Sequence, residues 1–167
     1  MIQIKESEII QEAEKGFDEF LQVIIDAYLK VTGEELSSEQ MNKLNGHQHT
    51  LLAWHYFCTE MRAGGFVQLI QNGYGPYIFE NPFAKALRLY GCTELSKLIY
   101  KAKEIYDANK KELTRETTEE EFNAMYVDFE VFDELEELYF EIEEEQTAIL
   151  AEHVDNNLED FIEVIKY

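Results

Sequence analysis

Residues 60–75 read EMRAGGFVQLIQNGYG, and this stretch decides the fold that the sequence predicts. It holds four of the eight glycines in the 167-residue chain. Gly64 and Gly65 interrupt a run of apolar residues with helical spacing, and glycine permits backbone conformations and close approaches that other residues resist. A short helix follows them, with Phe66, Leu69 and Ile70 on one face, and Gly73, Gly75 and Pro76 end it. We therefore expect two helices that meet at a Gly-Gly corner.

Apolar residues keep the period of an α-helix along most of the chain, and no segment alternates with the period of a strand. The last proline is Pro82 and the last glycine is Gly91, so the second half lacks the two strongest helix breakers. The helices expected from periodicity cover 6–30, 37–45, 47–62, 66–72, 82–91, a long segment after 93, and 130–150. Their expected N-terminal caps are Ser37 with Gln40, Asn81 before Pro82, Thr93, and Thr118 with Glu121. The sequence predicts an all-α fold, with residues 1–167 in a single compact domain of roughly seven to nine helices and the corner at its centre.

The charge of the chain is unusual in size and in distribution. The formal net charge is −21, yet 46% of the residues are hydrophobic, which excludes a disordered acidic tail. Residues 112–167 hold nearly all of the excess, with Arg115 and Lys166 as their only bases. Because nucleic-acid phosphates would be repelled, we expect no direct binding to nucleic acid and favour a basic partner.

The acids of residues 128–145 are the main candidate for a binding site. If residues 130–150 form one helix, its buried stripe is Phe132, Leu135, Leu138, Tyr139, Ile142, Ile149 and Leu150. The predicted partner-binding residues are Glu130, Asp133, Glu134, Glu137, Glu141, Glu144 and Glu145. Most follow one another at i+3 or i+4, about 5–6 Å apart, which is comparable with the charge spacing of a nucleic-acid backbone. The same row also fits a solvated face that only keeps the protein soluble.

Other polar clusters favour structural roles. Glu60, Gln68 and Asn72 can meet across the corner, where we expect them to satisfy backbone groups freed between the helices. The histidines near residues 47–55 and Cys58 lack the spacing of a metal site, so we predict no metal and no cofactor. The lysines between residues 97 and 111 fit the solvent-exposed face of a helix. Alternatively, they form ion pairs with the acidic helices of the same protein. No nucleophile–base arrangement is visible, and we predict that the protein is not an enzyme.

The corner also carries a family resemblance. The pattern E-x-x-x-G-G-F-x-Q-x-x-x-N-x-x-G, formed by Glu60, Gly64, Gly65, Phe66, Gln68, Asn72 and Gly75, resembles the bacterial DNA-mimic protein family. Ala86-Leu87 before Gly91-Cys92 and the helices near the C-terminus also fit that family, so the resemblance covers roughly residues 36–164. Ala63 stands where the family often has asparagine. The resemblance implies an acidic protein that binds a transcription factor, and it implies a homodimer.

Three functional hypotheses follow. The first is a DNA-mimic-like protein that binds a basic DNA-binding protein or transcription regulator in competition with DNA. The second is an acidic immunity or antitoxin-like module without DNA mimicry, and the third, which the spacing of residues disfavours, is an enzyme or metal-binding protein. The N-terminal residues contain no apolar stretch typical of a signal peptide, and no apolar run reaches the length of a membrane span. We therefore expect a cytoplasmic protein.

Overall fold

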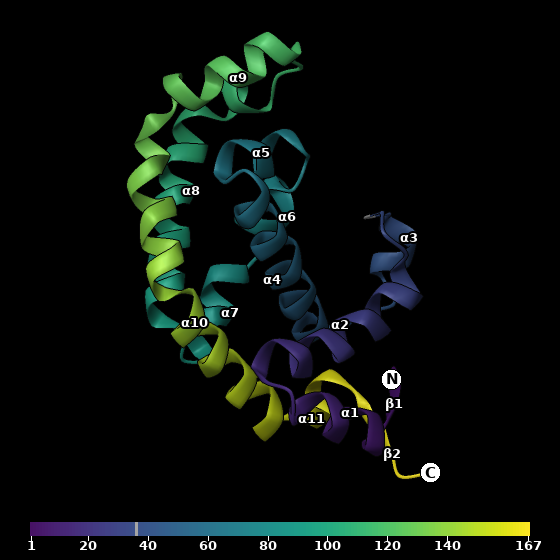
Figure 1. Cartoon of the computed structure of the whole chain (residues 1–167). Coiled ribbons are helices and arrows are strands. Elements are labelled where there is room, and N and C mark those ends of the chain that lie inside the picture. The colour runs from purple at the N-terminus through teal and green to yellow at the C-terminus, as the bar shows by residue number, and fades with distance from the viewer. Residues whose placement is uncertain (36) are drawn as a thin grey trace. The chain divides into compact units, whose positions relative to one another are not determined.

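The fold is all-α, as the sequence predicts (Figure 1). The structure is a computed structural model that describes residues 1–35 and 37–167. These residues form eleven α-helices, one 3-10 helix and two three-residue strands. They divide into two compact units, one of residues 1–52 and 147–167 and the other of residues 53–146. The single domain expected from the sequence stays a prediction.

The elements are assigned to these units by their residues. Unit 1 contains β1 (Gln3–Lys5), α1 (Glu6–Ala13), α2 (Phe17–Thr32), α3 (Ser38–Met41), α11 (Leu158–Phe161) and β2 (Glu163–Ile165). Unit 2 contains α5 (Phe66–Gln71), α6 (Gly75–Phe79), α7 (Phe83–Leu89), α8 (Thr93–Thr114), α9 (Glu119–Asp128) and the 3-10 helix η1 (Glu130–Phe132). Helices α4 (Gly46–Ala63) and α10 (Asp133–Asn156) contribute residues to both units.

Unit 1 joins the two ends of the chain. Strands β1 and β2 pair in parallel, with Ile4 opposite Val164. The buried Tyr28 hydroxyl donates a hydrogen bond of 2.8 Å to the carbonyl of Phe161, and the Gln48 amide donates one of 2.9 Å to the same oxygen. This carbonyl at the end of α11 thus accepts bonds from α2 and from the start of α4, so its buried oxygen is fully satisfied.

The prediction of a single helix over residues 6–30 is wrong, because two helices cover this range. Helix α1 ends at Ala13, and α2 begins at Phe17 after Gly16, whose φ of +151° lies outside the helical range. Ile10 and Phe17, which periodicity places on the buried stripe, are exposed on either side of this break. Gly33 ends α2 with a φ of +74°, in agreement with the sequence.

The expected caps are partly confirmed. Thr118 and Glu121 form the reciprocal capping box at the start of α9. Two other starts are displaced by one residue, because α7 begins at Phe83 and α8 begins at Thr93 itself. The Asn81 side chain instead donates a hydrogen bond of 3.0 Å to the Pro76 carbonyl, so it closes a turn and does not cap α7.

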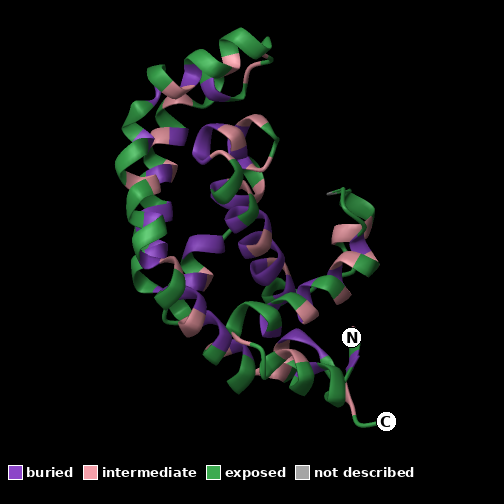
Figure 2. Cartoon of the chain, in the orientation of Figure 1, coloured by how far each residue is buried: buried purple, intermediate pink, exposed green. Residues whose placement is uncertain are grey.

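Aromatic side chains make the core of unit 2 and fix the first turns of α10. The Tyr139 ring meets Phe57 of α4 edge to face at 5.4 Å between centroids, and Phe132 stacks on Phe66 of α5 at 5.1 Å. Figure 2 shows buried residues on the inner side of α10 and exposed ones on its outer side. Because aromatic pairs prefer particular geometries, these contacts set which face of α10 is turned to solvent.

Candidate functional site

All seven acids predicted to bind a partner are exposed residues of unit 2. Glu130 belongs to η1, and the other six belong to the first four turns of α10, so residues 130–150 are not one continuous helix. We call these six residues, Asp133, Glu134, Glu137, Glu141, Glu144 and Glu145, the outer face of α10. Among the described residues no ion pair involves any of the seven. Their carboxylates are therefore available to an external cation.

The charge density of the outer face is comparable with that of a DNA strand. Asp133 and Glu145 are twelve residues apart, which is about 18 Å along a helix axis. Six carboxylates over that length have a mean axial spacing of about 3.6 Å, against one charge per 3.4 Å for each strand of a duplex. The backbone from which these side chains project is held in place, because Tyr139 and Ile142 on the inner side of the helix are buried.

Two other acids of α10 point inward and have partners within unit 2. The Arg62 guanidinium of α4 binds Glu143, with 2.8 Å from Nε to Oε1. Glu136 Oε1 accepts a hydrogen bond of 2.9 Å from the backbone N–H of Phe66, the first residue of α5. Burial raises the pKa of the Glu136 carboxyl, the bond from Phe66 lowers it, and the neighbouring Asp133 raises it further. The helix α10 is thus anchored to the glycine corner through a half-buried carboxylate.

The corner itself has the geometry that the two glycines were expected to provide. Gly65 has a φ of +84°, and a Cβ atom built on it would overlap the Glu136 carboxylate. A Cβ atom on Gly64 would overlap the side chain of Gln68. Gly75 is equally confined, because its added Cβ would lie 2.9 Å from the Tyr106 ring. Glycine at these positions allows the side chains of Gln68, Glu136 and Tyr106 to approach the backbone closely.

Glu60, Gln68 and Asn72 meet across the corner, but they bond to one another. Glu60 Oε2 accepts hydrogen bonds from the Gln68 amide at 3.1 Å and the Asn72 amide at 2.9 Å. We expected these side chains to satisfy backbone groups freed at the corner, and the hydrogen bonds differ from that. The backbone N–H of Phe66 donates to Glu136 instead. Sequence reasoning missed Glu136, and no spacing signals a contact between residues 70 positions apart.

Leu138 is a second residue that the sequence misplaced. It was expected in the buried stripe of α10, yet it is exposed, as is Phe140. Both flank the buried Tyr139, so each lies about 100° from the centre of the inner side. The buried stripe of this part of α10 is therefore narrower than periodicity suggests.

The sequence also contains clusters of histidine and cysteine and a cluster of lysines between residues 97 and 111. Within the described residues, no group of three or more His, Cys, Asp and Glu is placed to hold a metal ion. Burial raises the pKa of the Cys92 thiol to about 12, which keeps it protonated and unreactive. Lys110 pairs with Glu80 at 2.9 Å and Lys103 pairs with Asp107 on α8, so these two lysines are bound to acids outside α10.

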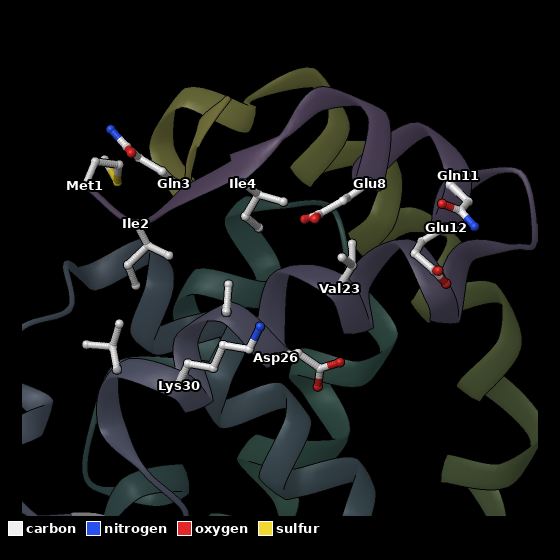
Figure 3. A pocket seen from close by; sticks show the side chains of 12 residues that line it. Met1, Ile2, Gln3, Ile4, Glu8, Gln11, Glu12, Val23, Asp26 and Lys30 are labelled. Atoms are coloured by element: carbon white, nitrogen blue, oxygen red, sulfur yellow. The ribbon is translucent and has the colours of Figure 1, made fainter. Parts of the chain in front are cut away.

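Unit 1 contains an open pocket of about 650 Å³ between β1, α1 and α2 (Figure 3). Glu8 of α1 and Lys30 of α2 reach toward it from two sides, and Ile4 and Val23 contribute apolar wall. Its lining also includes Glu12, whose carboxylate pairs with Lys15 at 2.9 Å. None of the seven predicted binding acids lines this pocket.

No helix in the described part of the chain is both long and apolar enough to cross a membrane.

The fold and surface define a class, that of acidic all-helical proteins with a rigid carboxylate-rich face. Residues 42–157 match the model of the family described as DMP19-like protein, and the chain belongs to this family. It is also 36% identical over 147 residues to the DNA mimic protein DMP19 of Neisseria meningitidis serogroup B, an alignment that covers 86% of this chain and 87% of that protein. The matched range includes the glycine corner and the outer face of α10, whereas the pocket of unit 1 lies before it.

Proposed function

We propose that this protein binds a basic DNA-binding protein, such as a transcription regulator, in competition with DNA, through Glu130 and the outer face of α10. The observation that supports the proposal most is the exposure of seven carboxylates on adjoining segments with no ion pair of their own among the described residues. Their linear charge density is close to that of a DNA strand. The name of the meningococcal relative, a DNA mimic, supports the same interpretation.

A fixed row of charges suits this function better than a flexible one. The row is held by a helix whose inner side is anchored by Tyr139, by Glu143 with Arg62, and by Glu136 with Phe66. A partner that binds it orders exposed side chains but no backbone, so less conformational entropy is lost than with a disordered segment. Because the contacts are between exposed charges, binding weakens steeply as salt is raised.

The experiment is a pull-down with the purified protein from a lysate of cells that naturally express it. A variant with Glu134, Glu137, Glu141 and Glu144 changed to Gln should lose the partner. A matched control with Glu6, Glu14, Glu39 and Glu104 changed to Gln removes the same charge from exposed positions elsewhere and should retain it. Equal capture by the two variants would contradict the proposal. A captured basic protein that does not bind DNA would favour an immunity or antitoxin-like module instead.

A further inference from the structure

The outer face of α10 has apolar borders. Between Asp133 and Glu145 every exposed residue is an acid except Leu138 and Phe140, which are 37% and 54% exposed. No neutral polar residue is exposed in this stretch. Single exposed apolar side chains are common on protein surfaces. Here, however, they are the only alternatives to carboxylates on a face of six acids, which calls for a specific account.

Helical geometry places the two side chains on opposite borders of the acids. Each residue of an α-helix is turned by about 100° from the one before, so Leu138 and Phe140 are about 160° apart across the solvent side. Glu137, Glu141 and Glu144 project between them. The Phe140 ring also contacts the buried Tyr139 edge to face at 5.2 Å, which holds it at this border.

We propose that Phe140, with Leu138 on the other border, anchors the partner through apolar contact while the acids bind its basic residues. The inference rests on the proposed function, because it describes the surface by which the partner proposed above binds. A protein that reads DNA binds phosphates through Lys and Arg, and some of the side chains that contact base edges beside them are apolar and meet thymine methyl groups. The partner that fits the acidic row with its borders of Phe140 and Leu138 is therefore a protein with a basic patch bordered by apolar side chains. Aromatic residues are enriched in protein interfaces and carry much of the binding energy where the partner buries them.

The affinity of the partner then has two contributions. The carboxylates give a contribution that falls as salt is raised, and the apolar borders give one that is nearly independent of salt. Replacing an acid therefore changes both the affinity and its salt dependence. Replacing Phe140 lowers the affinity and leaves the salt dependence unchanged.

Two designed helical peptides test the contact without the natural partner. In both, arginine and lysine form one face; one peptide carries leucine along the border of that face, and the other carries serine there. Wild-type protein should bind the leucine peptide about tenfold more tightly, which is the expected gain from burying a leucine side chain. In Phe140→Ser this ratio should fall clearly, with Leu138 supplying what remains. In the control Leu89→Ser, at an exposed apolar position on α7, it should persist.

The other outcomes are informative as well. An unchanged ratio in Phe140→Ser would overturn the apolar contact, and so would a change in salt dependence on that substitution. If sedimentation shows that Phe140→Ser dissociates a dimer while both peptides bind as before, a second copy of this chain occupies the border, and the inference is wrong. The four-fold Glu→Gln variant tests the proposed function separately, because undiminished binding of both peptides to it would contradict the acidic site itself.

Discussion

Two groups of carboxylates in unit 2 behave in opposite ways. At the glycine corner, Glu60 and Glu136 are half-buried and accept hydrogen bonds from side chains or backbone of the same unit. On the outer face of α10, six acids are exposed, and among the described residues none takes part in an ion pair. The difference teaches that the acids of one unit are of two kinds. Acids at the corner bond to other parts of the unit, and acids on the outer face are exposed and make no ion pair among the described residues.

The largest effect on stability is expected at the corner, from Gly65→Val. The substitution forces a β-branched side chain into a φ of +84° and against the Glu136 carboxylate, and we expect a loss of about 3 kcal/mol or more in unfolding free energy. Gly73→Val is the matched control, since Gly73 has a φ of +89° but no atom within 4 Å of an added Cβ. It should lose only the strain, about 1–2 kcal/mol. Chemical denaturation measures the unfolding free energy of both variants. Equal losses would mean that contact with the Glu136 carboxylate contributes nothing to the cost at Gly65.

A smaller loss is expected from Glu136→Ala. The substitution leaves the buried N–H of Phe66 without its acceptor, which costs about 1–3 kcal/mol. Glu137→Ala, one residue further on the outer face, should change stability by less than about 0.5 kcal/mol. The contrast between neighbouring glutamates separates the two groups of acids directly. Similar effects of both substitutions in denaturation curves would mean that the groups do not differ.

The pH dependence of stability provides a further contrast. Because burial raises the folded-state pKa of the Glu136 carboxyl above its unfolded value, its favourable contribution is complete below the unfolded pKa. That contribution is lost as the pH rises through the raised folded pKa. Glu136→Gln keeps an oxygen acceptor for Phe66 and removes the ionisation, so it should gain stability relative to wild type as the pH rises through this range. Thermal melts across pH measure the gain, and a constant difference between Glu136→Gln and wild type would contradict it.

The smallest effect on stability is expected from the four-fold substitution of Glu134, Glu137, Glu141 and Glu144 by Gln. Like charges at i+3 and i+4 destabilise a helix by a few tenths of a kcal/mol for each pair. Their removal should therefore stabilise the protein slightly, by about 1 kcal/mol or less. A marked loss in a thermal melt would show that the outer face is structural, contrary to the comparison.

Part of this organisation can be predicted from the sequence because it depends on local chemistry. The glycine pair marks the corner, and Thr118 and Glu121 mark the start of α9. The seven acids predicted to bind a partner are exposed, since burying charge is costly. The break at Gly16 was missed because apolar periodicity continues through it. Two features depend on packing between distant segments and carry no local signal. They are the bond from Phe66 to Glu136 and the exposure of Leu138.

The central claim is competition with DNA, and displacement of DNA tests it most directly. The captured partner is bound to fluorescently labelled operator DNA, and increasing amounts of this protein are added at fixed salt. Wild type and the variant with Glu6, Glu14, Glu39 and Glu104 changed to Gln should release the DNA at similar concentrations. The variant with Glu134, Glu137, Glu141 and Glu144 changed to Gln should release little or none. Release by that variant at the wild-type concentration, or a complex of wild type with the DNA-bound partner, would contradict the account.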